Sequence, residues 1–250
     1  MTNKAKILLL GGTAEARSLA GLIERTFQNK ITLINSLAGR TQNPAALPGL
    51  TRVGGFGGAL GLENYLKDEN ISAVIDATHP FAETISDHAY DACFRTETAR
   101  ITLARPEWKL PPSARWIEAN DAQDAAQMLP KIATRVFLTT GTYQLDHFAA
   151  LKKLFFLIRL IEQPEQFQNF ENYHLITARP PYDLETDENL FTDFQIDGLV
   201  SKNSGGRVPA KIDIALKNRV PIVLIKRPAP VPGPITTDAD ECIRCLEKLI

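Results

Sequence analysis

The sequence contains only three cysteines in 250 residues, which is too few and too scattered for a disulfide scaffold. Cys93 stands alone in a helical pattern. Cys242 and Cys245 form a C-x-x-C motif, but the motif lies in the last helical pattern, and one such pair supplies only half of a zinc site. We therefore expect all three thiols to be structural, with a redox or metal-binding role for the C-x-x-C pair as the alternative.

Histidine is also scarce, and none of the four histidines has a second one at the spacing of a helical metal pair. The sequence has no G-x-S-x-G motif of serine hydrolases and no G-x-x-x-x-G-K-[ST] phosphate loop. These absences predict a protein without a metal site that is neither a serine hydrolase nor a P-loop enzyme.

Net charge and long apolar runs are missing as well. The sequence has 28 Lys and Arg against 29 Asp and Glu, whereas a nucleic-acid-binding domain is usually basic. No apolar run approaches the ~20 residues that span a bilayer, and the apolar stretch near the N-terminus is too short for a signal peptide. With 44% apolar residues the chain is not disordered. We expect a cytoplasmic enzyme or binding protein without nucleic-acid or membrane partners.

Short apolar runs alternate with amphipathic patterns along the whole sequence. This alternation implies parallel sheets with right-handed crossovers, and about ten strands suggest two sheets rather than one. We predict an α/β protein with two Rossmann-like domains, residues 1–105 and 106–250, although an exchange of strands between the halves would blur that boundary. The main predicted strands are 6–10, 31–36, 71–76, 100–103, 115–118, 135–139, 154–160, 173–177, 197–200 and 220–225. The main predicted helices are 13–27, 60–69, 80–98, 121–129, 185–194, 210–217 and 238–249.

The end of the first predicted strand has features of a dinucleotide site. Gly11, Gly12 and Thr13 lie between a strand and a helix, and Glu15 follows. Glycines there let backbone N–H groups approach a pyrophosphate at the helix N-terminus. The motif departs from G-x-G-x-x-G, so a glycine turn that merely ends the strand is the alternative.

The end of the second strand indicates which dinucleotide is bound. NAD-binding proteins usually carry Asp or Glu there for the ribose 2′-hydroxyl. This sequence has Ser36 and Arg40 instead, with no acid between them. A guanidinium and a hydroxyl suit a 2′-phosphate, which predicts NADPH rather than NADH. A solvated loop arginine is the alternative.

Two more loops follow strands of the same half. Residues 54–58 read GGFGG, and so many glycines indicate either close approach to a ligand or a flexible surface loop. Residues 76–80 read DATHP. His79 in that loop is a candidate to carry a proton at neutral pH, to bind the cofactor or to orient the loop.

The second half has one comparable loop, SKNSGG at residues 201–206, whose cation, hydroxyls, amide and glycines predict an anion site. An ordinary polar loop is the alternative. Residues 200–228 contain seven Lys and Arg against one acid, whereas residues 162–197 contain nine acids against one base. The basic stretch suits a small polyanionic substrate. Three of its residues are interpreted as a solvated helix face: Lys211, Lys217 and Arg219.

Together these motifs resemble the precorrin-6A reductases of cobalamin biosynthesis, and the resemblance covers nearly the whole chain. The segments that carry it are ILLLGGTAEARSLA, SLAGR, GGFGG, DATHPFAETISDHAYDAC, RPEW and GLVSKNSGG, with AKIDIA and VPIVLIKRP further on. It implies an oxidoreductase that reduces one double bond of the precorrin-6A macrocycle to give precorrin-6B. A nicotinamide cofactor would supply a hydride to C19, and a proton would be added at C18. It also implies two Rossmann-like domains with the active site in the cleft between them.

The resemblance also points to individual residues. The predicted cofactor-binding set is Gly11, Gly12, Thr13, Glu15, Ser36, Arg40, Gly55, Phe56, Gly57, Thr78, His79 and Pro80. The predicted substrate-binding set is Arg179, Lys202, Asn203, Ser204 and Gly205. Lys202 and His79 are the catalytic candidates, and Lys202 would serve as the proton donor or its electrostatic partner. Proton delivery by water is the alternative.

Several alternatives stay open. Family members that act on the cobalt complex often use NADH, and shared motifs do not separate the two kinds; Arg40 favours NADPH and the metal-free substrate. A different NADPH-dependent reductase of a smaller substrate and a non-catalytic NADP-sensing regulator are the competitors from other classes. The expected partner is a tetrapyrrole polycarboxylate, with hand-over of the product to other enzymes of the pathway.

Overall fold

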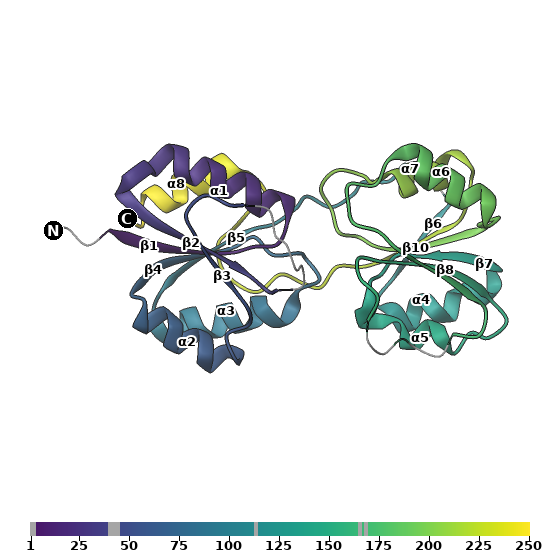
Figure 1. The fold of residues 1–250 in the computed structure, drawn as a ribbon, viewed down its shortest axis with the longest axis horizontal. Helices are drawn as coiled ribbons and strands as arrows, with labels where there is room; N and C mark the ends of the chain where they lie inside the picture. The colour runs from purple at the N-terminus through teal and green to yellow at the C-terminus, as the bar shows by residue number, and fades with distance from the viewer. Residues whose placement is uncertain (1–3, 40–45, 113–114, 165–166, 168–169) are drawn as a thin grey trace. The chain divides into compact units, whose positions relative to one another are not determined.

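The computed structural model describes residues 4–39, 46–112, 115–164, 167 and 170–250. The chain forms two units, one made of Met1–Pro106 with Pro228–Ile250 and the other made of Glu107–Arg227 (Figure 1). Each unit contains a six-stranded sheet whose strands are paired in parallel, which confirms the predicted α/β class. Within these described ranges, no helix is long and apolar enough to cross a membrane.

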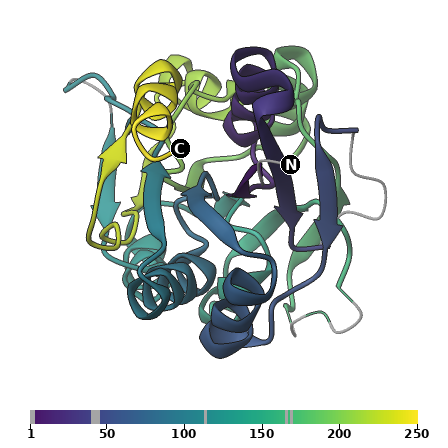
Figure 2. The ribbon, with the colours of Figure 1, turned by 90° about the vertical axis from the view of Figure 1, so that its left-hand side faces the viewer.

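The first unit is a doubly wound sheet. Its strands are β1 (Ala5–Leu10), β2 (Ile31–Leu37), β3 (Leu50–Val53), β4 (Ile71–Asp76), β5 (Ala99–Leu103) and β12 (Ile235–Thr236). Its helices are α1 (Ala14–Phe27), α2 (Gly58–Asp68), α3 (Glu83–Thr96) and α8 (Ala239–Glu247), with a 3₁₀ turn at Gln28–Lys30. The strand order is β12-β5-β4-β1-β2-β3, so it reverses between β1 and β4. Helices α1 and α8 lie on one face of the sheet, and α2 and α3 lie on the other (Figure 2).

The central strands are buried on both faces, as their continuous apolar runs predict. The four residues from Ile7 to Leu10 in β1 are at most 1% exposed. Ile7 and Leu9 join the core beneath α1 and α8, whereas Leu8 and Leu10 join the core beneath α2 and α3. Because helices cover both faces, the loops at the carboxyl ends of the strands are the natural place for a ligand.

The second unit repeats this architecture. Its strands are β6 (Trp116–Ala119), β7 (Arg135–Leu138), β8 (Phe155–Leu160), β9 (Tyr173–Thr177), β10 (Gly198–Lys202) and β11 (Ile222–Ile225). Its helices are α4 (Ala122–Met128), α5 (Asp146–Ala149), α6 (Leu184–Asp193) and α7 (Ala210–Lys217), with 3₁₀ turns at Leu129–Lys131 and Thr142–Gln144. The strand order is β6-β11-β10-β7-β8-β9, which reverses between β7 and β10. Helices α6 and α7 cover one face and α4 and α5 the other (Figure 1).

The structure divides the chain differently from the predicted domains 1–105 and 106–250. The chain passes from the first unit to the second after Pro106, next to the predicted boundary, but Pro228–Ile250 belongs to the first unit. There β12 pairs with β5, and α8 packs against α1. The first sheet therefore combines the consecutive strands β1 to β5 with the distant β12, whereas the second sheet consists of the six consecutive strands β6 to β11.

Two smaller differences concern the ends of elements. The helix predicted to begin near Pro80 begins at Glu83, because Ala82 N donates to His79 O at 2.7 Å and closes a separate turn. Strand β12 was not predicted, because its two residues, Ile235 and Thr236, are too short to give a pattern.

Candidate functional site

In the first unit, the loops after β1 and β4 meet where the strand order reverses. Thr13 caps α1, since its Oγ1 accepts a hydrogen bond from Ala16 N at 3.0 Å. The same hydroxyl donates its proton to Ala77 O at 2.8 Å. Thr13 thus joins the two loops, and the predicted phosphate contact would fall to backbone N–H groups rather than to the Thr13 hydroxyl.

Gly12 keeps the approach to the N-terminus of α1 open. Its φ is +102°, a conformation that L side chains rarely adopt, and an added Cβ would meet nothing within 4 Å. Gly11 is packed more closely, with Ala16 Cβ 3.4 Å from the position of such an atom. The first-turn N–H groups of α1 and the helix dipole suit a phosphate at this place.

Glu15, a predicted cofactor-binding residue, is paired with an arginine. It lies in the first turn of α1, and its Oε2 is 2.5 Å from Nη2 of Arg105, which follows β5. The guanidinium offsets the negative charge that would otherwise oppose a phosphate at the helix N-terminus. The pair also ties the end of β5 to α1.

Ser36, at the end of β2, is bonded to an arginine that the sequence interpretation missed. Arg52 Nη1 donates to Ser36 Oγ at 2.8 Å. The same guanidinium donates at 3.0 Å to the carbonyl oxygens of Gly54 and Gly55, and its carbon lies 3.7 Å from the centre of the Phe56 ring. Arg52 therefore organises the GGFGG loop and places a cation beside the predicted 2′-phosphate position.

The register of the sheet is the signal that could have identified Arg52. Ser36 and Arg52 are direct partners across the β2–β3 pair, so their side chains lie next to each other at the carboxyl ends of the two strands. The sequence alone does not give this register, because β3 is short and exposed. Arg40, the predicted phosphate partner, lies outside the described residues.

The glycines around Phe56 leave the rest of this loop open. At each of the four, an added Cβ would meet nothing within 4 Å, and Gly57 caps α2 in the left-handed conformation. The Phe56 ring packs edge-on against Tyr65, with 5.2 Å between the ring centroids. Because the ring is held by Tyr65 and Arg52, the loop offers its backbone to a ligand.

The DATHP loop after β4 is held in a fixed shape. Asp76 is 2% exposed, and its Oδ1 accepts hydrogen bonds from Thr78 N at 3.1 Å and from Thr78 Oγ1 at 2.7 Å. His79 Nδ1 accepts from Phe81 N at 3.2 Å, so a neutral His79 carries its proton on Nε2. Pro80 lies in the turn between His79 and Phe81. The structure therefore brings Thr78 and His79 to the same strand end as the first glycine loop.

In the second unit, the SKNSGG segment starts inside β10, whose last residue is Lys202. Ser204 N donates to Lys202 O at 2.7 Å, and the two following glycines have φ of +67° and +76°. Asn203 is 7% exposed, and its Oδ1 accepts from Trp108 N at 3.3 Å. Asn203 thus fixes the Trp108 backbone through its amide oxygen, and it stays a ligand-binding candidate with Lys202, Ser204 and Gly205.

Arg179 lies apart from this loop in the strand order. It follows β9, which is separated from β10 by β7 and β8. Its Nη2 is paired with Glu162 Oε1, and both side chains are nearly half exposed. The structure therefore does not join Arg179 to Lys202 through neighbouring strands.

The interpretation of Lys211 as part of a solvated helix face is wrong. Its Nζ lies 2.6 Å from Oγ1 of Thr139, which follows β7. Burial and the nearby cations Arg159 and Lys202, opposed by Asp187, lower the pKa of Lys211 to about 7. Lys217 on the same helix fits the interpretation, because its side chain is 69% exposed.

The two buried cysteines are structural in character. Cys93 and Cys242 are buried in the core, and this burial raises the pKa of each thiol to about 12. Thiols of such high pKa are poor nucleophiles and metal ligands. Within the described part of the chain, no group of three or more His, Cys, Asp or Glu is placed to hold a metal ion.

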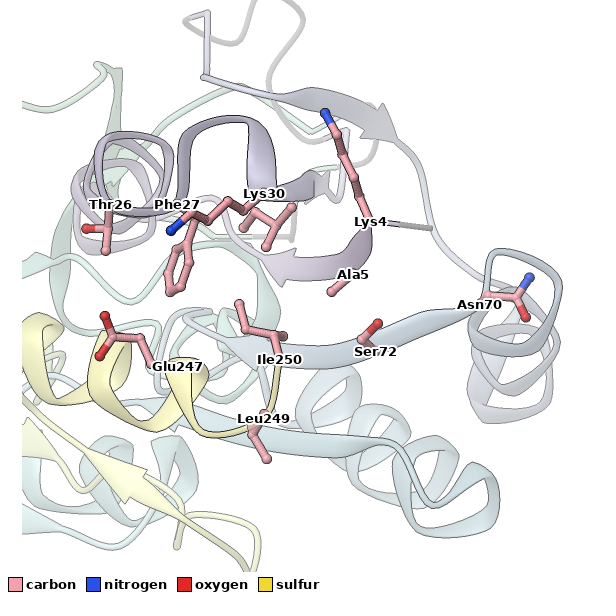
Figure 3. A pocket seen from close by; sticks show the side chains of 11 residues that line it. Lys4, Ala5, Thr26, Phe27, Lys30, Asn70, Ser72, Glu247, Leu249 and Ile250 are labelled. Atoms are coloured by element: carbon pink, nitrogen blue, oxygen red, sulfur yellow. The ribbon is translucent and has the colours of Figure 1, made fainter. Parts of the chain in front are cut away.

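A cavity of about 700 Å³ lies at the amino ends of the strands of the first sheet (Figure 3). It is lined by residues at the starts of β1, β2 and β4 and at the chain end, among them Ala5, Ile31, Ser72 and Ile250. Because the strands are parallel, the cavity lies at the opposite end of the strands from the glycine loops. The lining of the cavity includes none of the predicted site residues. We assign no part of the reaction to it.

The strand order and the loops at the switch point define a Rossmann-like, dinucleotide-binding class of α/β protein. A nicotinamide dinucleotide fits the chemistry of the first unit: an open glycine loop at a helix N-terminus for a pyrophosphate, and a serine with an arginine at the end of β2. The family model described as Precorrin-6x reductase CbiJ/CobK matches residues 6–247, and the chain belongs to this family.

Individual relatives agree with this membership. Precorrin-6A reductase of Rhodococcus erythropolis is 41% identical over 234 residues, which cover 93% of each chain. Cobalt-precorrin-6A reductase of Synechocystis sp. is 28% identical over 249 residues, covering 95% of this chain and 94% of the relative. A solved structure of CobK precorrin-6A reductase superposes with a TM-score of 0.89 at 36% identity, covering 98% of this chain and 97% of that one.

Proposed function

We propose that this protein reduces one double bond of precorrin-6A, giving precorrin-6B, with NADPH as the reductant. The observation that carries the proposal is the 41% identity to a precorrin-6A reductase over 93% of both chains. The metal-free macrocycle is favoured over its cobalt complex, because five relatives named precorrin-6A reductase are 38–41% identical and three named cobalt-precorrin-6A reductase are 23–28% identical.

The first unit is proposed to hold the cofactor. The N-terminus of α1, with Gly12 before it, would bind the pyrophosphate through backbone N–H groups. The Arg52 guanidinium beside Ser36 supplies positive charge where a 2′-phosphate would lie. When bound, the reduced nicotinamide supplies a hydride. Thr78 and His79, held by Asp76 and the following turn, would orient that end of the site.

We predict that Arg40→Ala weakens NADPH binding about 10- to 100-fold and leaves NADH binding unchanged, because only NADPH carries the 2′-phosphate that charge-assisted hydrogen bonds would hold. Cofactor fluorescence gives both dissociation constants. Arg52→Ala is the comparison, and it should weaken both cofactors because Arg52 holds the loop carbonyls of Gly54 and Gly55. An unchanged NADPH constant in Arg40→Ala would refute the role of Arg40.

Lys202 is proposed to deliver the proton or to stabilise the charge that develops with it. We predict that Lys202→Ala lowers kcat about 100- to 10,000-fold, as loss of a general acid does, with NADPH affinity intact. Lys226→Ala is the matched control, because its side chain is 60% exposed and lies 4.0 Å from Glu118. If Lys202→Ala and Lys226→Ala have the same kcat, Lys202 does not take part in proton delivery.

The proposal is tested by following NADPH absorbance after adding precorrin-6A, in metal-free form and as the cobalt complex. We expect rapid oxidation with the metal-free form and slower oxidation with the cobalt complex. An NADP-sensing regulator would bind NADPH without oxidising it with either form. A reductase of a smaller substrate would likewise leave NADPH unchanged with both macrocycles.

A further inference from the structure

Lys211 occupies the point in the second sheet where the strand order reverses. It lies in the first turn of α7, the helix that follows β10 and the SKNSGG segment in the chain. Its Nζ reaches across to Thr139 Oγ1, 2.6 Å away, at the end of β7. Because β7 and β10 are the two strands between which the order reverses, this is where a doubly wound sheet binds a ligand.

The hydrogen bonds of Thr139 leave Lys211 with donors to spare. The Thr139 hydroxyl donates its single proton to Val200 O at 2.9 Å, so it accepts from Lys211. A protonated amine has three N–H donors, of which this contact uses one. The next residue, Thr140, is 1% exposed, and its Oγ1 has no hydrogen-bond partner among the described residues.

The charges around Lys211 are unbalanced. The charged groups that act on it are Arg159 on β8 and Lys202 on β10, which oppose its protonation, and Asp187 on α6, which favours it. Asp187 is already paired with Arg159, and Asp213 on α7 is exposed. A cation in the first turn also opposes the dipole of α7. Unless an anion binds nearby, these neighbours make the charged form of Lys211 unfavourable.

We propose that the Lys211 ammonium, seated on Thr139 at the end of β7, binds a carboxylate group of the substrate. The inference rests on the proposed function, since the acetate and propionate groups of the macrocycle are the anions in question. Lys211 as a whole residue is only partly buried, and so is its hydrogen bond with Thr139, which leaves room for a ligand group at the rim of this contact. The site extends the predicted substrate set beyond Lys202 and the SKNSGG loop.

A carboxylate partner makes substrate affinity depend on pH. Lys211 is cationic below its pKa of about 7 and neutral above it, whereas ordinary carboxylates stay ionised throughout this range. We predict that the KM of the wild-type enzyme rises as pH increases from 6 to 9, to a limit about 10- to 100-fold higher. Lys211→Met should have that high KM at all pH values, and Lys211→Arg should keep the low KM to higher pH.

A second measurement does not depend on turnover. Competitive acylation with acetic anhydride, read by mass spectrometry, reports the reactivity of each lysine in the folded wild-type protein. We expect Lys211 to be protected by uroporphyrin, an octacarboxylate tetrapyrrole used as the probe, and not by NADPH alone. Lys217 on the same helix is the control and should be unprotected, because its Nζ pairs with Glu188 on the surface.

The outcomes separate this inference from the proposed function. Protection of Lys211 by uroporphyrin supports the carboxylate site even if precorrin-6A is not reduced. Protection by NADPH alone, equal protection of Lys211 and Lys217, or no protection at all would overturn it. A KM profile that is the same in Lys211→Met and the wild type would overturn it too, whatever the rate of NADPH oxidation.

Discussion

Replacing Asp187 with alanine is expected to destabilise the second unit by about 3–5 kcal/mol, because it leaves a buried guanidinium without its partner. Arg159 and Asp187 form an ion pair whose side chains are 3% and 0% exposed. The Arg159 guanidinium also lies 3.7 Å from the centre of the Tyr182 ring. With the carboxylate removed, the cation keeps its desolvation cost and loses the attraction that offset it.

Both tryptophans of the sequence, Trp108 and Trp116, lie in the second unit, so urea unfolding followed by tryptophan fluorescence reports on that unit. Glu188→Ala is the matched control on the same helix. Glu188 pairs with Lys217 at 2.7 Å on the surface, where such a pair contributes about 0–1 kcal/mol. If the two variants unfold at the same urea concentration, the buried pair does not stabilise the unit as described.

Gly61→Ala is expected to have the largest effect in the first unit. A Cβ at Gly61 would lie 1.7 Å from Phe56 O, a backbone atom, so α2 and the GGFGG loop have to move apart. We expect a loss of about 1–3 kcal/mol or more from this overpacking. Because Phe56 supports the Arg52 guanidinium, we also expect both nicotinamide cofactors to bind more weakly.

Gly21→Ala provides the comparison for this substitution. Gly21 lies within α1, and an added Cβ would meet only the flexible end of Arg25, at 3.3 Å. Alanine there is expected to stabilise the helix by up to ~1 kcal/mol. Thermal melts by far-UV circular dichroism measure both variants, with the tryptophan signal as the reference for the second unit. A melt of Gly61→Ala that matches the wild type would show that the contact relaxes without cost.

The sequence predicted the two parallel sheets because their central strands are continuous apolar runs, as in Ile7–Leu10. It did not predict that Pro228–Ile250 returns to the first unit. The closing helix has the same amphipathic pattern whichever sheet it covers, and β12 has only two residues. Strand exchange is decided by pairing between distant segments, which local patterns do not encode.

The candidate site was predictable where a motif fixes the position and not where register decides it. Gly12 and Thr78 follow strands that the sequence marks clearly, and the structure places both at the switch point of the first sheet. Arg52 became visible only through its pairing with Ser36 across β2 and β3. Lys211 looked like a surface lysine by helical spacing, and its contact with Thr139 joins segments 72 residues apart, which helical spacing does not encode.

Tracing the reducing hydrogen tests the proposed reduction most directly. The protein is incubated with precorrin-6A and NADPH that carries deuterium at the transferred position, and the macrocycle is analysed by mass spectrometry. Transfer of the deuterium to the macrocycle, with one further hydrogen from solvent, is the expected result. A macrocycle of unchanged mass, or one that gains hydrogen only from solvent, would contradict NADPH-dependent reduction by this protein.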